Sequence, residues 1–508
     1  MSDVRTPSAD GTGVGREERT ADVVVVGGGV AGLVAALECA RIGLVVTVLE
    51  RESAPGGCVG RIELDGLTLD SGAESFATRG GSVAELLGEL GLADDIVAPN
   101  ASGAWLVLPD DRGGVRAAPL PKTGMLGIPA NPLGDDVREI IGWRGAIRAY
   151  LDRVRPILKI GRAHSLGALV RQRMGRLVLD RLVTPISSGI YSSDPMDLDL
   201  DVVAPGLNEA MSRNGSLSGG VGELVETRRA GSAVQGLRGG MHRLVDALLA
   251  ELDRFGVTVV TGADVTGLES LAYASATTGP DESPGWRATA AVGESALVVD
   301  AAYAIVATPA RSSRALLATA VDGWADVAEW PDSTAVEIVT LVLDAPALAD
   351  APRGTGVLVA ADAPGVAAKA LTHSSAKWAW VAEAAGSRQV VRLSYGRAGA
   401  ANPLDGLGER AVEELAVADA ALLTGVPLAP AMLVASGRTV WRDAVSHAAL
   451  GQRDRVRAVE EALAAVPGLE ATGSWLSGTG LASVVPHARA AAERVRHLAV
   501  AARAGEGA

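Results

Sequence analysis

The hydrophobic pattern near the start of the chain changes from strand-like to helix-like and back. Residues 21–26 form a short apolar, β-branched run, which is typical of a strand buried in a parallel sheet. Three glycines, 27–29, interrupt the run, and residues 30–42 then have helical composition. A second apolar run covers residues 45–49 and is closed by Glu50. The segment therefore predicts one β–α–β unit of about thirty residues.

Further along the chain, the periodicity of apolar residues predicts both strands and helices. Residues 137–215 are rich in helical patterns, whereas residues 119–132 and 216–240 are punctuated by Pro or Gly and are expected to be loops. Strands are expected at 61–69, 257–260, 301–307, 335–344 and 390–395, and helices at 166–182, 241–255, 456–465 and after residue 480. At 508 residues, this pattern predicts an α/β protein of two or three domains.

Composition narrows the classes of function. Hydrophobic residues make up 48% and charged residues 21% of the chain, which is ordinary for a folded protein. The formal net charge of −14 argues against nucleic-acid binding, which needs a basic surface. Cys39 and Cys58 make neither a disulfide framework nor a CxxC pattern, and the six histidines are scattered. We therefore expect no metal site and a reduced, cytoplasmic location.

The termini and the least charged stretch bear on location. Residues 1–20 lack an apolar core typical of signal peptides, and we expect them to be a disordered tail. Residues 420–437 are uncharged but contain two prolines and two glycines, and a membrane span needs about 20 mostly apolar residues. No transmembrane helix is expected, and a peripheral contact with the inner face of the membrane is left open.

The glycines that follow the first strand have the spacing of a dinucleotide-binding turn, Gly27-Gly-Gly29-Val-Ala-Gly32. The first glycine allows a tight turn, Gly29 lets a pyrophosphate approach the backbone, and Gly32 lets helix and strand pack closely. The helix that begins with Val30 and Ala31 directs its free N–H groups and its dipole at the phosphates. Glu50 can accept hydrogen bonds from ribose hydroxyls. Gly28 belongs to the same expected contact surface.

The residues after Glu50 extend this unit. Arg51 follows directly, a Gly56-Gly57 pair lies in the next loop, and the run Asp70-Ser-Gly-Ala-Glu-Ser-Phe76 comes after a strand. This series resembles the flavin amine oxidase and porphyrinogen oxidase superfamily, which implies FAD as the cofactor. The resemblance assigns further cofactor contacts to Arg51, Gly56, Gly57, Gly72, Ala73, Glu74 and Ser75. The family often has a basic residue after the glycine pair, where this chain has Cys58.

Further segments narrow the resemblance to the oxygen-dependent protoporphyrinogen and coproporphyrinogen III oxidases. Their joint order, from about residue 21 to 500, is more specific than any one of them. The segments are 72–79 (GAESFATR), 120–129 (LPKTGMLGIP), 182–194 (LVTPISSGIYSSD), 236–241 (GLRGGM), 372–378 (THSSAKW) and 392–397 (RLSYGR).

The resemblance implies a fold of three parts: a discontinuous, Rossmann-like FAD-binding domain of the glutathione-reductase/p-hydroxybenzoate-hydroxylase type, a mixed-sheet substrate domain and an inserted helical domain. The FAD-binding domain would comprise residues 21–75, 237–310 and 436–504. The substrate domain would comprise 76–118, 220–236 and 311–435, and the helical domain 119–219.

The resemblance also assigns residues around the flavin and the substrate. Val265 would contact the adenine through its backbone, and Trp441 would pack near the flavin. The turn Gly478-Thr479-Gly480-Leu481 would place a helix N-terminus beside the reduced flavin, where its dipole stabilises negative charge. Arg79 is the candidate cation for a substrate propionate, and Ile190 is a candidate substrate contact. From the residues alone, Val265, Trp441 and Arg79 are equally compatible with ordinary packing or a solvated surface.

The activity implied is the six-electron oxidation of coproporphyrinogen III to coproporphyrin III with O2 as acceptor and release of hydrogen peroxide, in heme biosynthesis. No catalytic side chain is required, because the flavin carries the chemistry. Coproporphyrinogen is chosen because the Arg-rich, Lys-poor composition suits a Gram-positive bacterium; only Lys122, Lys159, Lys369 and Lys377 occur. A retained lysine in such a chain hints at a point-charge role.

Several alternatives stay open. Protoporphyrinogen IX is the nearest alternative substrate, a flavin amine oxidase needs an aromatic cage that five Tyr and two Phe make hard to build, and a non-catalytic relative would bind prenylated proteins. A contact with another heme-pathway enzyme, and a monomer or a homodimer, are equally compatible with the sequence. Departures from the family at Gly80, Ser446-His447-Ala448 and Gly480-Leu-Ala482 lie in segments expected near the ring or substrate.

Overall fold

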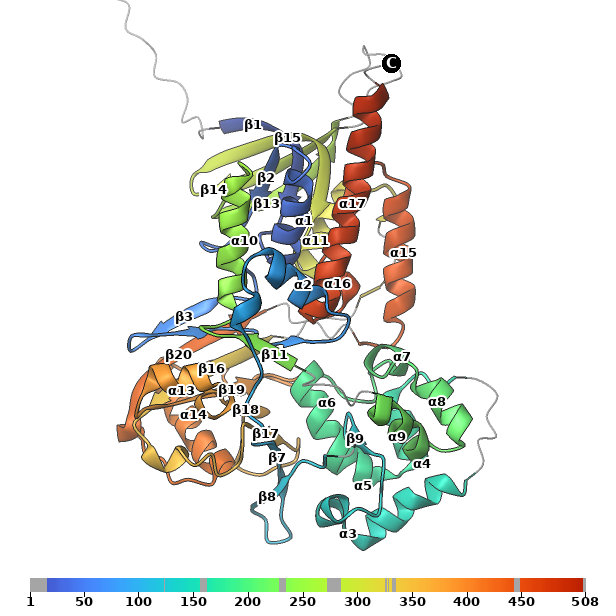
Figure 1. Cartoon of the computed structure of the whole chain (residues 1–508), viewed down its shortest axis with the longest axis vertical. Helices are drawn as coiled ribbons and strands as arrows, with labels where there is room; N and C mark the ends of the chain where they lie inside the picture. Colours follow the sequence, from blue (N-terminus) through green and yellow to red (C-terminus); the bar gives the residue numbers. More distant parts are fainter. Residues whose placement is uncertain are drawn as a thin grey trace, which may run out of the picture.

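Two seven-stranded sheets and a layer of helices organise the chain (Figure 1). The computed structural model describes residues 16–122, 124–155, 162–227, 234–271, 285–324, 327, 329–330, 335–442 and 448–505. The first sheet lies at the end of the molecule that carries the chain's C-terminal helix, and the second sheet lies with the helical layer at the other end (Figure 1).

The first sheet has the strand order β12-β2-β1-β15-β14-β13, with β21 also paired to β15. The pairs of β1 with β2 and β15, of β2 with β12, and of β15 with β21 are parallel, whereas β13, β14 and β15 pair antiparallel. The strands are β1 (Arg16–Val26), β2 (Val46–Leu49), β12 (Thr258–Val260), β13 (Ala263–Ser270), β14 (Trp286–Val292), β15 (Ser295–Val306) and β21 (Leu469–Ala471).

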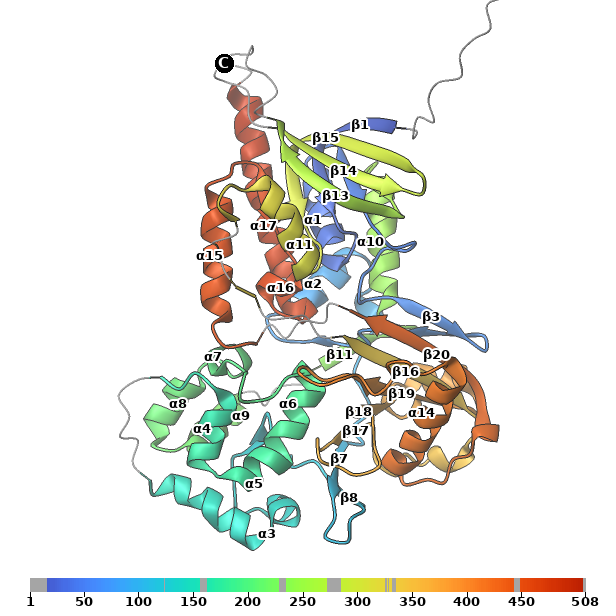
Figure 2. The ribbon, with the colours of Figure 1, turned by 180° about the vertical axis from the view of Figure 1, so that it is seen from behind.

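Helices cover both faces of this sheet because alternate residues of β1 point to opposite sides. Val23 and Val25 belong to a core with helices α1 (Val30–Ala40), α2 (Ser82–Glu89), α10 (His242–Arg254) and α17 (Leu481–Gly505). Val24 and Val26 belong to a second core with α11 (Ala310–Ala320), α15 (Gln452–Ala464) and α16 (Ser474–Ser477). Figure 2 shows α11 and α15 on the face turned away from α10.

The second sheet has the strand order β20-β16-β19-β18-β17-β7-β8. All neighbours are antiparallel except β17 and β7. The strands are β20 (Leu433–Trp441), β16 (Val336–Leu343), β19 (Gln389–Tyr395), β18 (Ala370–His373), β17 (Gly356–Val359), β7 (Ala104–Pro109) and β8 (Val115–Pro119).

The helical layer shares a single core with the second sheet, since Leu341 and Leu393 of the sheet cluster with Leu182 and Leu207 of the helices. The layer comprises α3 (Asp135–Tyr150), η2 (Leu151–Arg153), α4 (Leu166–Arg173), α5 (Arg176–Val178), the π-helix η3 (Leu179–Val183), α6 (Thr184–Tyr191), α7 (Leu200–Val203), α8 (Leu207–Asn214) and α9 (Leu217–Thr227). The helix α14 (Glu409–Thr424) packs on the same core.

Short elements connect these layers. They are the hairpin β3 (Arg61–Leu64) and β4 (Leu67–Asp70), the three-stranded sheet of β5 (Phe76–Ala77), β11 (Val234–Leu237) and β6 (Ile96–Val97), the pair β9 (Gly124–Met125) and β10 (Ile128–Pro129), and the helices η1 (Ala93–Asp95), α12 (Ser374–Lys377), α13 (Ala379–Ala385), η6 (Pro346–Leu348) and η7 (Pro430–Met432). The expected strands at 257–260, 335–344 and 390–395, the helix ending near residue 254 and the long final helix are confirmed to within a few residues. The single strand expected at 61–69 is instead the hairpin of β3 and β4, and the strand expected at 301–307 begins earlier, at Ser295.

Several expectations are wrong. The strand β1 begins at Arg16, so residues 16–20 pair with β15 and are not part of a disordered tail. Residues 216–240 are not mainly loop, because α9 and β11 occupy much of the described part. Residues 119–132 include the pair β9–β10.

Three elements also differ from the expected domain ranges. The strand β20, with residues on both sides of the expected boundary at 436, lies wholly in the second sheet. The helix α11, expected in the substrate domain, packs on the first sheet. The helix α9 crosses the expected boundary between residues 219 and 220, and Leu217 and Val221, on either side of it, belong to the same core.

Two findings bear on whether the chain could enter a membrane. No helix in the described ranges is both long and apolar enough to cross a bilayer. Residues 420–437, the least charged stretch of the sequence, are folded into α14, η7 and β20, where Leu423 is fully buried.

Candidate functional site: a glycine turn between strand and helix

The glycine turn after β1 is closely packed at two glycines and open at the third. A Cβ atom on Gly27, whose φ is +106°, would lie 2.7 Å from the carbonyl oxygen of Ala307, and one on Gly32 would lie 1.9 Å from that of Gly27. A Cβ on Gly29 would meet no atom within 4 Å. The helix α1 begins at Val30, so its first-turn amides, including those of Val30 and Ala31, have no partner within the helix. The turn therefore leaves open space at Gly29 beside a helix N-terminus, an arrangement that suits an anion.

Glu50 closes β2 beside this turn. Its side chain is almost buried, and its Oε2 accepts a hydrogen bond of 2.6 Å from the Gly28 amide. Its Oε1 accepts one of 2.8 Å from the amide of Glu52. Each carboxylate oxygen keeps one further acceptor position, so Glu50 can still accept hydrogen bonds from a diol. The exposed Arg51 pairs with Glu52 at 3.1 Å.

The second glycine pair lies directly against the turn. The Gly56 amide donates to the Gly28 carbonyl oxygen at 2.8 Å, and Gly29 and Gly56 form a parallel bridge. A Cβ on Gly57 would lie 3.4 Å from the Cα of Gly29. The structure therefore brings residues 56–57 against the glycine turn at the start of α1, as the family resemblance implied.

Gly72 links this region to the second sheet. A Cβ on Gly72 would lie 2.1 Å from the Cys58 carbonyl oxygen and 2.9 Å from the Cζ2 of Trp441. The Ala73 amide donates to the same Cys58 carbonyl at 2.9 Å. Trp441 ends β20, and its buried indole Nε1–H has no hydrogen-bond partner within the described residues. The indole thus supplies a free donor close to the predicted cofactor residues.

Glu74 does not face the turn as a free carboxylate. It accepts hydrogen bonds from Lys377 Nζ at 2.5 Å and from Arg392 at 2.9 Å, and Arg392 also donates to the Gly72 carbonyl oxygen at 2.6 Å. Burial alone would raise the pKa of Glu74, but the two cations outweigh it and lower the pKa to about 2. Glu74 thus joins the glycine-turn region to the second sheet through Arg392, and the neighbouring Ser75 is half-buried.

The turn before the last helix forms a second open helix end. Gly478 has φ +110°, Thr479 is exposed, and a Cβ on Gly480 would meet no atom within 4 Å. The helix α17 begins at Leu481 and packs beside α1 (Figure 1). Arg79 is exposed and donates to the Ser483 Oγ at 3.1 Å, so it lies at this helix end.

The remaining predicted residues lie apart from these turns in sequence. Val265 is half-buried on β13, the strand whose first residue, Ala263, donates its amide to the Glu50 carbonyl oxygen at 2.8 Å. Ile190 lies on α6 and is 58% exposed, which is unusual for a large apolar side chain. Their roles stay predictions.

Two cations, the buried Lys369 and the half-buried Arg397, escaped the assignment of site residues, although the first was noticed as a retained lysine. Lys369 is fully buried and bonds to Ser192 Oγ at 2.5 Å and to the Gly396 carbonyl oxygen at 2.8 Å. Arg397 has a buried Nε–H without a partner within the described residues. The scarcity of lysine was a signal for the first, whereas nothing in the sequence indicated the burial of the second.

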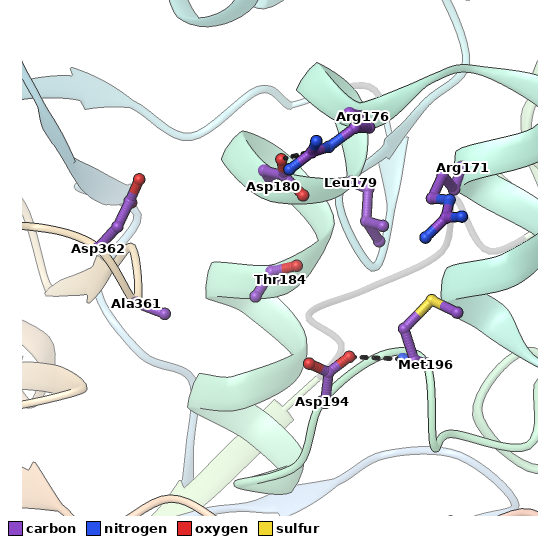
Figure 3. A pocket seen from close by; sticks show the side chains of 9 residues that line it. All are labelled: Arg171, Arg176, Leu179, Asp180, Thr184, Asp194, Met196, Ala361 and Asp362. Atoms are coloured by element: carbon purple, nitrogen blue, oxygen red, sulfur yellow. Dashed lines mark hydrogen bonds and ion pairs between the residues drawn. The ribbon is translucent and has the colours of Figure 1, made fainter. Parts of the chain in front are cut away.

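A cavity of about 620 Å³ lies elsewhere, between the helical layer and the loop after β17 (Figure 3). Its charged groups largely satisfy each other or the backbone: Arg176 pairs with Asp180 at 3.6 Å, and the Met196 amide donates to Asp194 at 2.8 Å. None of the predicted site residues lines it; the lining residues are Arg171, Arg176, Leu179, Asp180, Thr184, Asp194, Met196, Ala361 and Asp362. No cluster of metal-ligating side chains occurs in the described part of the chain.

Taken together, an open glycine at a helix N-terminus, an acid with spare acceptor positions and a free indole N–H fit a dinucleotide with a planar ring. The family model for flavin containing amine oxidoreductases matches residues 30–496. The chain belongs to this family, and its cofactor is therefore a flavin.

Relatives of known name are similar over nearly the whole chain. The coproporphyrinogen III oxidase of Bacillus subtilis (strain 168) is 25% identical, with 92% of this chain and 96% of the relative covered. That of Propionibacterium freudenreichii subsp. freudenreichii is 28% identical, with 98% and 95% covered.

Solved structures share the fold. A crystal structure from Exiguobacterium sp. 255-15, described provisionally as a protoporphyrinogen oxidase, has a TM-score of 0.76 at 23% identity and covers 96% of this chain and 100% of its own. Putrescine oxidase bound to putrescine has a TM-score of 0.64 at 16% identity, with 95% and 100% covered.

Proposed function

We propose that the protein is an FAD-dependent oxidase that converts coproporphyrinogen III to coproporphyrin III. The observation that carries this proposal is the open turn at Gly29 beside Glu50, in a chain whose named relatives at similar length include coproporphyrinogen III oxidases. FAD, when bound, would accept electrons pairwise from the macrocycle and pass them to O2. Six electrons and six protons leave the porphyrinogen, and three O2 become three H2O2.

The side chains and amides of the protein would bind and orient both partners. The amides at the start of α1 and the backbone at Gly29 would hold the pyrophosphate, and Glu50 would hold the adjoining ribose. The open end of α17 at Gly480 would stabilise negative charge on the ring. Arg79 at the same helix end would meet a substrate carboxylate. Ile190 would contact the macrocycle.

Protoporphyrinogen IX is the second candidate substrate, because a protoporphyrinogen oxidase of Arabidopsis thaliana is 27% identical over half of this chain. An amine substrate is supported only by similarity of fold to solved structures such as putrescine oxidase, which is 16% identical to this chain. The composition leaves few Tyr and Phe for an aromatic cage. We therefore rank an amine oxidase below both porphyrinogens.

A peripheral contact with a membrane is part of the proposal, and it involves helix α3 rather than residues 420–437. Beyond the non-helical Gly142, small or acidic residues of α3 and η2 point inward, and large apolar residues point outward. The outward face consists of Trp143, Ile147, Tyr150, Leu151 and Val154, each 40–69% exposed. Arg144 is exposed beside it, and Arg148 and Arg153 donate to backbone carbonyls. An apolar face flanked by arginines that form no ion pair within the described residues suits an anionic lipid surface.

The proposed reaction is tested with the purified protein, excess FAD and each porphyrinogen in air, by following porphyrin fluorescence and peroxide. We expect fluorescence to appear faster with coproporphyrinogen III than with protoporphyrinogen IX, and peroxide to rise in step. A faster reaction with protoporphyrinogen would reverse the choice of substrate. Peroxide formed only with amines would refute both.

A further inference from the structure

Lys369 is a cation enclosed by protein. Its side chain is 1% exposed, and two of its three N–H donors are used, by Ser192 Oγ and by the Gly396 carbonyl oxygen. Within the described residues, no carboxylate forms an ion pair with it. Burying an ammonium group without a counter-charge is unfavourable. A bound anion would remove that cost.

A second cation lies beside the first. Arg397 follows Gly396 directly, and the amide of the next residue, Ala398, donates to the Ser192 carbonyl oxygen at 2.8 Å. The Arg397 guanidinium makes one long contact, of 3.5 Å, to the Val359 carbonyl oxygen. The buried Nε–H of Arg397 has no partner in the described chain. Burial, and then the charge of Arg397, lower the pKa of Lys369 to about 7. Two positive groups thus share one enclosed region with unused donors.

The strand register places this pair at the same end of the second sheet as Trp441. Trp441 pairs with Val336, and the neighbouring Glu337 pairs with Tyr395. The amide of Lys369 donates to the Ser394 carbonyl oxygen at 2.8 Å. Lys369 thus continues the cross-strand row of Glu337 and Tyr395, three strand spacings or about 14 Å from β20. Its side chain lies on the face of the sheet opposite that of Trp441, because Trp441 belongs to the adjacent row.

The helical layer covers the same place. Ser192, which bonds to Lys369, is the C-terminal cap of α6, the helix that carries the exposed Ile190. As far as the structure describes the chain, the other titratable side chains beside the backbone around Lys369 are Asp419 and Tyr395. The Asp419 carboxylate accepts from the Ala368 amide at 2.8 Å and from the Tyr395 hydroxyl at 3.2 Å, and so is committed to them.

We propose that Lys369 and Arg397 form a binding site for a carboxylate of the substrate, on the face of the second sheet that the helical layer covers. This inference rests on the proposed function, since the ligand it names is a propionate of the porphyrinogen. The carboxylate would occupy the third donor of Lys369 and the unpaired Nε–H of Arg397. It would supply the negative charge that the two cations lack.

The test measures binding of coproporphyrin III, the oxidised tetracarboxylate, by fluorescence titration of the flavin-loaded protein. We expect Lys369→Met to weaken binding roughly tenfold or more, as loss of a charged hydrogen bond does. Lys369→Arg should restore most of the affinity. The matched control is Lys122→Met, which removes an exposed lysine and should change nothing.

A pH series separates a ligand contact from a structural tie. An anion binds the protonated lysine better, so binding to the natural protein should weaken as pH rises through about 7, and Lys369→Met should remove that dependence. Equal affinities and equal pH profiles for Lys369→Met and Lys122→Met would overturn the inference. Should Lys369→Met fail to fold, Arg397→Gln provides the same comparison at the less buried partner.

Different results would contradict the proposed reaction and the proposed carboxylate site. If coproporphyrinogen III does not bleach the flavin of the natural protein, the proposed reaction is wrong whatever the variants bind. If it bleaches the flavin and the Lys369 and Arg397 variants bind coproporphyrin III as tightly as the natural protein, only the carboxylate site is wrong.

Discussion

Glu74 shows how one residue can hold two sheets in register. Its carboxylate lies on the segment after β4, while Arg392 and Lys377 belong to the second sheet and the helix that follows β18. The family resemblance suggested a cofactor contact, but the side chain is engaged by two cations. Its contribution to the site is therefore positional, because Arg392 also binds the Gly72 carbonyl next to Trp441.

Replacing Glu74 should destabilise the fold in a pH-dependent way. Glu74→Gln leaves two cations without a partner, and we expect a loss of about 3 kcal/mol in the free energy of unfolding at neutral pH. The pKa of Glu74 is lowered to about 2, so its stabilisation is complete above the ordinary carboxyl pKa and is lost as pH falls toward 2.

Chemical denaturation from pH 7 down to about pH 3 provides the measurement for Glu74. The difference between the natural protein and Glu74→Gln should shrink as the pH falls. A difference that stays constant over this range would show that the ion pairs are not its source. The exposed Glu63→Gln, on β3, serves as the control.

Replacing Arg79 tests its assignment as the cation that binds a substrate carboxylate. Arg79→Ala removes an exposed guanidinium that donates to the Ser483 hydroxyl, so the fold should tolerate the change. We expect KM for the tetracarboxylate substrate to rise roughly tenfold or more while FAD affinity stays nearly constant. Steady-state kinetics and flavin titration measure the two effects. Unchanged kinetics would remove Arg79 from the site.

At the scale of elements, what the sequence could predict depended on whether the signal was local. Glycine spacing after a β-branched run predicts the turn at Gly27–Gly32, because its geometry is set by neighbours along the chain. The helix α9 was missed because Gly219, Gly220 and Gly222 resemble a loop signal. A Cβ on Gly220 would lie 2.6 Å from the Met211 amide, so glycine there permits close packing of α8 and α9. That requirement exists only in the folded chain.

The glycine turn permits a test that separates binding from folding. Gly29→Ala adds a methyl group where no protein atom lies within 4 Å, so stability should hold while FAD affinity falls roughly tenfold or more. Gly32→Ala places a methyl group against the Gly27 carbonyl and should destabilise the fold by about 1–3 kcal/mol. Gly88→Ala, in an open position of α2, should lower neither FAD affinity nor stability.

Flavin titration and thermal unfolding of the three glycine variants provide the comparison. If Gly29→Ala bound FAD as tightly as Gly88→Ala does, the turn would not be the pyrophosphate site. Equal loss of stability in Gly29→Ala and Gly32→Ala would contradict the packing described for the turn.

The outward face of α3 predicts binding to vesicles. Ile147→Asp with Leu151→Asp replaces two exposed apolar side chains and should abolish sedimentation with phosphatidylglycerol vesicles, while thermal stability stays unchanged. The control is Val500→Asp, on the solvent side of α17, which should sediment like the natural protein. Sedimentation that survives the double change would exclude this face, and a change in oligomeric state would assign it to self-association.

At the scale of the whole molecule, segments far apart in the chain meet at one junction. The glycine turn and Gly72 come from the N-terminal part of the chain. Trp441 and the N-terminal end of α17 come from its last part. The sequence predicted these separate segments through family resemblance. The pair Lys369 and Arg397 could not be assigned, because its environment depends on the register of the second sheet and the position of α6.

The most direct measurement is the visible spectrum of the purified protein, first with excess FAD and then with coproporphyrinogen III in the absence of O2. We predict a bound yellow chromophore that is bleached by the porphyrinogen and returns when air is admitted, together with the absorption of coproporphyrin. A folded protein that acquires no yellow chromophore and shows no heat of binding with FAD would contradict the account at its foundation.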